Sequence, residues 1–121
     1  MRSNPFQPIY AKCNSGDPAD KYRDLADFPS IIDVELTSLC NFRCLMCPTG
    51  IGALKRPSGF MSREVFKAIV GECKEYGAAV RLIGWGEPLL HPDVARFVRM
   101  ASDAGLLTHL NTNGSRLSRD T

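Results

Sequence analysis

The sequence predicts an α/β fold built on a parallel sheet. Three short apolar segments of strand length, at residues 31–36, 78–83 and 106–111, alternate with helical periodicity at 62–77 and 92–104. In such an alternation each helix is the crossover that leads the chain to the next parallel strand. We therefore expect a parallel βαβαβ unit. Because this unit is too short to close a barrel, we also expect it to be the first part of a longer structure.

Residues 1–30 are expected to form an irregular extension before a core domain at residues 31–121. Four prolines and a glycine interrupt any periodic pattern in this extension. A short helix is expected only at 21–28, where apolar residues share a face. Cys13 lies here, and we interpret it as a free thiol.

The first predicted strand, residues 31–36, has one apolar and one polar face. Ile32, Val34 and Leu36 alternate with Asp33 and Glu35. Because a parallel strand covered on both faces is usually apolar throughout, the polar face indicates a wet or ligand-filled space beside it. The alternative is an edge strand with one solvated face.

The two helices that follow have their own start and stop signals. Ser62 is a suitable N-cap for the first and Gly77 a suitable stop, while Pro92 and Gly105 bracket the second. The apolar positions at helical spacing are expected to form the core: Val65, Phe66, Ile69, Val70, Cys73, Tyr76, Val94, Phe97, Val98 and Ala101.

The loop after the first strand carries Cys40, Cys44 and Cys47 within eight residues. These thiols can close on one metal centre, but no fourth protein ligand lies nearby in sequence. A structural zinc site has four protein ligands, whereas a reactive centre keeps a position open. The loops at 84–88 and 111–114 follow the next two strands, so we expect all three loops to meet at the carboxyl edge of the sheet, where α/β proteins bind ligands.

These motifs resemble those of the radical S-adenosylmethionine (radical SAM) superfamily. Cys40-x-x-x-Cys44-x-x-Cys47 after the first strand resembles the superfamily signature. Gly86-Glu87-Pro88 resembles its glycine–glutamate–proline motif, and Thr112-Asn113-Gly114 lies where many members carry it. The resemblance spans residues 31–118 and implies the amino-terminal part of a partial (β/α)6 TIM-like barrel.

The resemblance also implies an enzyme with two cofactors. Cys40, Cys44 and Cys47 would hold three irons of a 4Fe–4S cluster, and S-adenosylmethionine would bind the fourth. The reduced cluster would cleave the sulfonium C–S bond, and the 5′-deoxyadenosyl radical would abstract hydrogen from an unidentified substrate. An enzyme of this kind is an oxidoreductase that takes its electron from an external donor such as a flavodoxin or ferredoxin.

The family pattern assigns further residues to the cofactor. Gly86, Glu87 and Pro88 would line the methionyl site, and Met46 would approach the adenine. Asn113 is a candidate contact for cofactor or substrate. The sequence around Met46 is most similar to members with a carboxyl-terminal extension bearing further iron–sulfur clusters (SPASM-type). Many of those modify peptides, so we expect a peptide or a small molecule as the unidentified substrate.

Alternative interpretations remain open at this point. The cysteines could form a zinc site with Cys13, His91 or His109 as the fourth ligand, in a non-catalytic zinc- or iron–sulfur-binding fragment. His91 is otherwise a local capping or surface residue, and His109 a satisfied polar residue. Lys55 and Arg56 are interpreted as a solvated loop.

Composition excludes several function classes. A net charge of +2 gives no clear signal for nucleic acid or for an anionic membrane. No apolar run approaches the length of a membrane span. Five cysteines, three of them tightly clustered, do not look like a disulfide framework, so we expect a cytoplasmic, reducing compartment.

Overall fold

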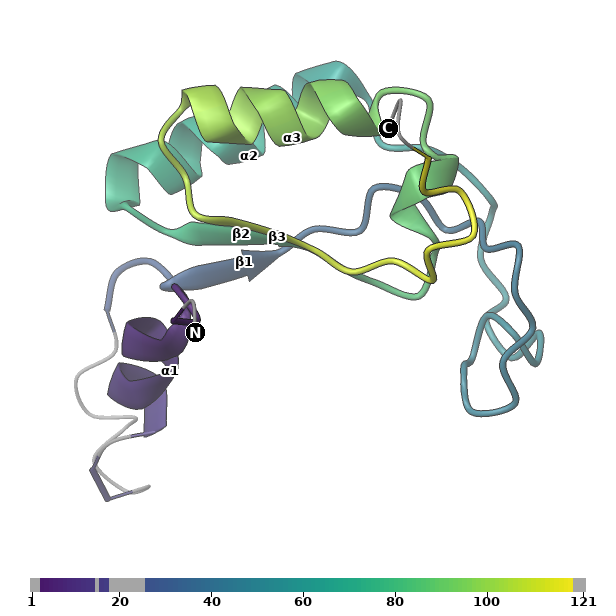
Figure 1. The fold of residues 1–121 in the computed structure, drawn as a ribbon, viewed down its shortest axis with the longest axis horizontal. Helices are drawn as coiled ribbons and strands as arrows, with labels where there is room; N and C mark the ends of the chain where they lie inside the picture. The colour runs from purple at the N-terminus through teal and green to yellow at the C-terminus, as the bar shows by residue number, and fades with distance from the viewer. Residues whose placement is uncertain (1–2, 15, 18–25, 119–121) are drawn as a thin grey trace.

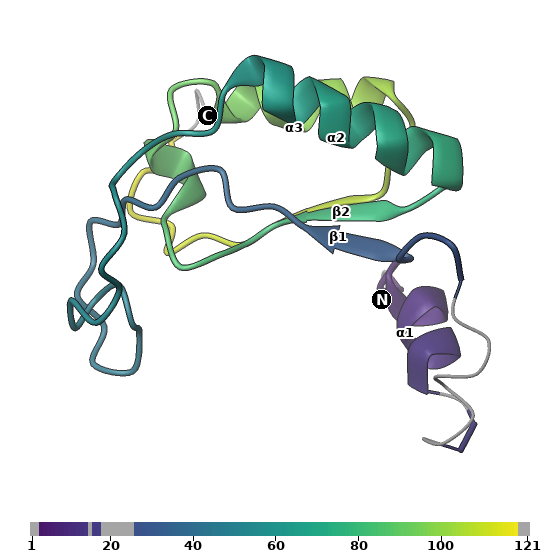
Figure 2. The same cartoon turned by 180° about the vertical axis from the view of Figure 1, so that it is seen from behind.

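The structure is a parallel sheet with two helices packed side by side on one face (Figures 1 and 2). The computed structural model describes residues 3–14, 16–17 and 26–118. The strands β1 (Ile31–Asp33), β2 (Ala79–Leu82) and β3 (Thr108–Leu110) lie in the order β1-β2-β3, all parallel. The helices α2 (Arg63–Tyr76) and α3 (Val94–Asp103) are the crossovers, and a 3-10 helix, η1 (Pro88–Leu90), precedes α3. The predicted βαβαβ unit is confirmed.

The capping signals of α2 act as predicted. The Ser62 hydroxyl accepts a hydrogen bond from the Val65 N–H, and Gly77 ends the helix in the left-handed conformation at φ 67°. A helix that starts and ends at fixed residues presents a fixed face to the sheet. This face buries Phe66, Val70 and Cys73.

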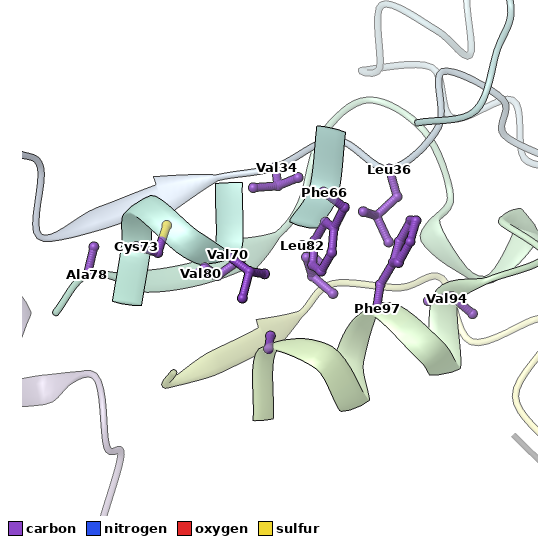
Figure 3. Close-up of a cluster of buried hydrophobic side chains, with 11 residues drawn as sticks. Val34, Leu36, Phe66, Val70, Cys73, Ala78, Val80, Leu82, Val94 and Phe97 are labelled. Carbon is purple, nitrogen blue, oxygen red and sulfur yellow. The ribbon is translucent and has the colours of Figure 1, made fainter. Parts of the chain in front are cut away.

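The core lies between the sheet and the two helices. Phe66 of α2 and Phe97 of α3 stack with their ring centroids 4.4 Å apart, in one cluster with Leu36 and Leu82 (Figure 3). Val34 and Leu36 are buried here, as the alternation of the first strand predicts. The prediction that Val65 and Tyr76 belong to the core is wrong, since both side chains are half exposed.

The segment predicted to be irregular contains a helix, α1 (Gln7–Asn14). Pro8 does not prevent it, because an N–H in the first turn has no partner within the helix. Asn4 stabilises the start of the helix. Its side-chain Oδ1 accepts a hydrogen bond of 3.0 Å from the Phe6 N–H, and its carbonyl oxygen accepts one of 3.0 Å from the Gln7 N–H. The short helix predicted at 21–28 lies largely outside the described residues. The division between residues 1–30 and 31–121 stays a prediction.

Helix α1 lies on the side of the sheet opposite to α2 and α3, near the amino-terminal ends of the strands (Figures 1 and 2). On this face Asp33, Arg81 and His109 lie side by side in register across the three strands. Arg81 binds the Asp33 carboxylate through two hydrogen bonds of 2.6 Å, and its hydrogen bond and charge lower the pKa of Asp33. The Phe6 ring packs edge-on against His109 with centroids 5.8 Å apart. The polar face of the first strand is therefore paired.

No helix among the described residues has the length and apolar content needed to cross a bilayer.

Candidate functional site

The three loops at the carboxyl ends of the strands meet, as the sequence predicts. The long loop between β1 and α2 carries the cysteines and projects from this end of the sheet in both views (Figures 1 and 2). Its Leu39 carbonyl accepts a hydrogen bond of 2.7 Å from the Glu87 N–H in the loop after β2. Side chains from all three loops complete the junction.

Glu87 is the centre of this junction. Its side chain is buried, with the residue only 2% exposed. One carboxylate oxygen, Oε1, accepts hydrogen bonds from the Leu89 N–H at 2.9 Å and from the Thr112 hydroxyl at 2.7 Å. The other, Oε2, accepts one from the Asn113 N–H at 2.7 Å. A carboxylate engaged in this way joins the loops after β2 and β3.

Asn113 connects the third loop to the cysteine loop. Its side-chain N–H donates to Asn41 Oδ1 at 3.0 Å, and Asn41 donates in turn to the Ser115 hydroxyl at 2.8 Å. Asn41 lies next to Cys40 in the sequence. The predicted rim residue Asn113 is therefore hydrogen-bonded to the side chain of the residue that follows the first cysteine.

Glu35 forms a second junction, which the sequence analysis missed. Its Oε1 accepts hydrogen bonds from the Trp85 N–H at 2.7 Å and the Gly86 N–H at 3.2 Å. Arg56 binds the same carboxylate with both terminal nitrogens, including Nη2 to Oε1 at 2.7 Å. Burial alone would raise the pKa of Glu35, but the hydrogen bonds from Arg56, Trp85 and Gly86 and the Arg56 charge together lower it. Lys55 and Arg56 lie in an exposed loop, as predicted, but the Arg56 guanidinium is paired with Glu35, which the sequence analysis did not predict.

The two glycines of the loop after β2 are required by close contacts. A Cβ on Gly86 would lie 1.8 Å from the Thr37 carbonyl oxygen, and one on Gly84 would lie 2.5 Å from Glu35 Cγ. Neither contact is possible between real atoms. Glycine at both positions lets the loop lie directly against the chain that leaves β1.

The three thiols lie on the loop, but they are not gathered in this structure. Cys44 is exposed, and Cys40 and Cys47 are half-buried. The Cys40 sulfur accepts a hydrogen bond of 3.4 Å from the Phe42 N–H. Among the described residues, no three side chains of Cys, His, Asp or Glu are placed to hold one metal ion.

The cysteine loop nevertheless has a defined backbone and a hollow beside Cys40. A Cβ on Gly50 would lie 2.4 Å from the Cys44 carbonyl oxygen, so glycine is needed for the loop to fold back on Cys44. A cavity of about 360 Å³ is lined by Cys40, Phe42, Arg43, Thr49, Gly50, Ile51 and Gly52. Thr49 Oγ1 is buried and has no hydrogen-bond partner within the described part of the chain. An unpaired hydroxyl at a cavity beside a thiol is a group that a bound ligand could satisfy.

Other predicted site residues have different surroundings. Met46 is 92% exposed, which leaves its thioether free to contact a ligand, and Pro88 is buried at the start of η1. Trp85, beside the Glu35 junction, is half exposed. Gly86 is half-buried.

His91 is occupied by the protein on both ring nitrogens. Nδ1 accepts a hydrogen bond of 3.0 Å from the Asp93 N–H at the start of α3, so Nε2 carries the proton and donates to the Met61 carbonyl at 2.9 Å. The predicted capping role is confirmed, although the side chain is buried and not at the surface. His91 is thus unavailable as a fourth zinc ligand. His109 is exposed on β3, 3.4 Å from Asn111 Oδ1, and the side chain of Cys13 lies outside the described residues.

Comparisons with known proteins agree with this architecture. The sequence matches the model of the Radical SAM superfamily over residues 34–121. It is 34% identical over 94 residues to the AdoMet-dependent heme synthase of Methanosarcina barkeri. This alignment covers 78% of this chain and 27% of the relative. It is 29% identical over 104 residues to the PqqA peptide cyclase of Bradyrhizobium diazoefficiens. This second alignment covers 84% of this chain and 27% of the relative.

A solved structure has a similar fold. The crystal structure of BtrN in complex with AdoMet and 2-DOIA aligns with a TM-score of 0.70 and 25% identity, over 79% of this chain and 40% of BtrN. The chain thus spans about a quarter of the length of the two curated relatives named above. The likeness confirms the predicted barrel-type α/β fold class.

Proposed function

The chain belongs to the radical SAM superfamily, as its motifs predict, and on that premise we propose that it forms the first part of the catalytic core of a radical SAM enzyme. Members of this superfamily are enzymes that use a 4Fe–4S cluster and S-adenosylmethionine. The observation that carries the proposal is the meeting of the cysteine loop, the Gly84–Pro88 loop and the Thr112–Gly114 loop at one edge of the sheet, joined through Glu87 and Asn113.

Cys40, Cys44 and Cys47 would hold the cluster. The donor set fits, because three thiols on one short loop leave one iron without a protein ligand. The cavity beside Cys40 and the unpaired Thr49 hydroxyl also fit a bound group at this loop. When bound to these thiols, the cluster would supply the electron for reductive cleavage of S-adenosylmethionine and so the radical chemistry of the reaction.

The chain's own residues bind and orient the second cofactor. Gly86 brings the backbone of its loop close to the cysteine loop, where it would line the methionyl group with Pro88. Glu87 would line the methionyl group with them, and its carboxylate, which already accepts three hydrogen bonds, also holds the loops together. Met46 is exposed for contact with the adenine. Asn113 is the remaining candidate contact for cofactor or substrate.

The substrate, the reductant and the compartment belong to the same proposal. A peptide or a small molecule is the substrate class, since one relative is named as a peptide cyclase and another as a heme synthase. A flavodoxin or ferredoxin supplies the electron in a reducing, cytoplasmic compartment, where the thiols stay free to bind iron. A SPASM-type extension would lie beyond Thr121.

Anaerobic reconstitution tests the proposal. The chain is supplied with iron and sulfide, its metal content is measured, and electron paramagnetic resonance spectra are recorded with and without S-adenosylmethionine. We expect a reduced 4Fe–4S signal that changes when S-adenosylmethionine is added. Stoichiometric zinc, or a cluster signal indifferent to S-adenosylmethionine, would overturn the proposal in favour of a non-catalytic metal-binding fragment.

Two cysteine variants separate the ligand sets. Cys44→Ala is expected to lose the 4Fe–4S signal, because two thiols in the loop cannot hold three irons. Cys13→Ala is the matched control and is expected to keep it. Loss of metal in Cys13→Ala would instead identify Cys13 as a fourth ligand and favour the zinc site.

A further inference from the structure

We propose that Glu35 and Arg56 are positioning residues that set the backbone of the Gly84–Gly86 loop for S-adenosylmethionine and couple it to the cysteine loop. The inference rests on the proposed function and adds to it two residues to which the resemblance assigns no role in the cofactor site. We call the two side chains, with their hydrogen bonds to Trp85 and Gly86, the Glu35 clasp.

In the Glu35 clasp, one carboxylate contacts both the loop after β2 and the cysteine loop. Glu35 follows β1 by two residues, and its Oε1 receives two successive backbone N–H groups of the loop after β2. Arg56 approaches from the far end of the cysteine loop, 21 residues later in the chain, and binds both carboxylate oxygens. Paired planar groups of this kind fix orientation as well as distance. One carboxylate therefore orders two loops at once.

Arg56 lies at the far end of the cysteine loop, after all three cysteines. The pair Glu35–Arg56 closes the base of the loop that contains all three cysteines. The chain just after Arg56 is fixed to the segment after β1, since the Gly59 N–H donates to Ser38 Oγ at 2.9 Å and the Met61 N–H to the Leu36 carbonyl at 2.8 Å. This anchor leaves Arg56 a short, constrained path to Glu35.

The clasp also fixes which backbone groups the loop after β2 leaves free for a ligand. Glu35 occupies the N–H groups of Trp85 and Gly86, and a Cβ on Gly84 would collide with the Glu35 side chain. No hydrogen-bond donor within the described part of the chain is directed at the carbonyl oxygens of residues 84–86. With its donors bound by Glu35, the loop offers acceptors, and acceptors are what the ammonium group of a methionyl ligand requires.

The first experiment measures the clasp without any cofactor. Amide hydrogen exchange is followed at Trp85 and Gly86 in the metal-free chain, for wild type and Arg56→Ala. Loss of the Arg56 charge frees the Glu35 side chain to move, so we expect exchange at both amides to become about tenfold faster. Arg56→Lys should recover part of this protection, because lysine restores the charge without the two-pronged geometry.

Arg63→Ala is the matched control. Arg63 forms the same kind of two-bond pair with Asp93, at 2.7 and 2.9 Å, but it joins the start of α2 to the start of α3. Exchange at Trp85 and Gly86 should be unchanged in this variant. Wild-type exchange rates in Arg56→Ala, or equal acceleration in Arg63→Ala, would overturn the inference, because the pair would then act on general stability or not at all.

The second experiment measures the effect on the cofactor. The reconstituted wild type, Arg56→Ala and Glu35→Gln are titrated with S-adenosylmethionine, and the change in the cluster's paramagnetic signal gives Kd. We expect wild-type iron content and a Kd raised about tenfold in both variants, with Arg63→Ala unchanged. A wild-type Kd in both variants would overturn the inference about Glu35 and Arg56 but leave the proposed function intact. A wild-type cluster whose signal ignores S-adenosylmethionine overturns the proposed function, whatever the exchange rates show.

Discussion

The buried carboxylate of Glu87 gives the most direct test of how the loops are held. Glu87→Ala removes the acceptor of three hydrogen bonds, from the Thr112 hydroxyl and from the N–H groups of Leu89 and Asn113. A buried donor left without a partner costs about 1–3 kcal/mol. Because Thr112 and Asn113 lie at the exposed rim, water can reach their freed groups, and each loss falls at the low end of that range. We expect the free energy of unfolding to fall by about 3 kcal/mol.

Glu87→Gln provides the intermediate case. Its amide oxygen can replace one carboxylate oxygen, but its NH₂ group is a donor facing another donor, so we expect a loss of about 1–2 kcal/mol. Urea denaturation of the metal-free chain, followed by circular dichroism under reducing conditions, measures both values. Glu75→Ala, on the exposed face of α2, is the control and should stay within about 0.5 kcal/mol of wild type. If Glu87→Ala matches this control, the three hydrogen bonds do not hold the loops together.

Three further predictions follow from single contacts. Gly86→Ala should displace its loop, because the new Cβ would lie 1.8 Å from the Thr37 carbonyl oxygen, and a wild-type melting temperature would contradict this. Ser62→Ala should lower the free energy of unfolding by about 1 kcal/mol, since the Val65 N–H loses its cap; no change in a urea melt would argue against the cap. The folded-state pKa of Glu35 is lowered from its ordinary value of 4.5. Its stabilising contribution is therefore present above that value and lost as the pH falls through the lower folded value. Acid titration of stability should be flatter in Glu35→Gln, and identical curves would refute the assignment.

Local patterns in the sequence were sufficient for most of the fold. The alternation of Val34 and Leu36 with Asp33 and Glu35 predicts which face of the first strand is buried, because side chains alternate along any strand. Ser62 and Gly77 predict the ends of α2, because capping involves only neighbouring residues. The same reasoning failed for α1, where four prolines in the first thirty residues outweighed the capping by Asn4.

The candidate site was predictable only in part. The cysteine spacing and the glycine–glutamate–proline motif are local, and they were sufficient to identify the superfamily. That Glu87 lines the methionyl site stays a prediction from the motif, whereas its burial and its hydrogen bonds to the loop after β3 could be found only in the structure. His91 was placed at the surface or at a cap, and only the packed structure shows both of its ring nitrogens engaged.

The order of strands and helices, the ends of α2 and the grouping of three thiols on one loop can thus be read from the sequence, because each depends on residues close together in the chain. The contact of Glu35 with Arg56 and with the Gly84–Gly86 loop is found only in the folded structure. Trp85 and Gly86 lie 50 and 51 residues from Glu35. They meet it because parallel pairing of β1 with β2 brings the carboxyl ends of both strands to one edge, and no local pattern encodes which side chains then face each other across it.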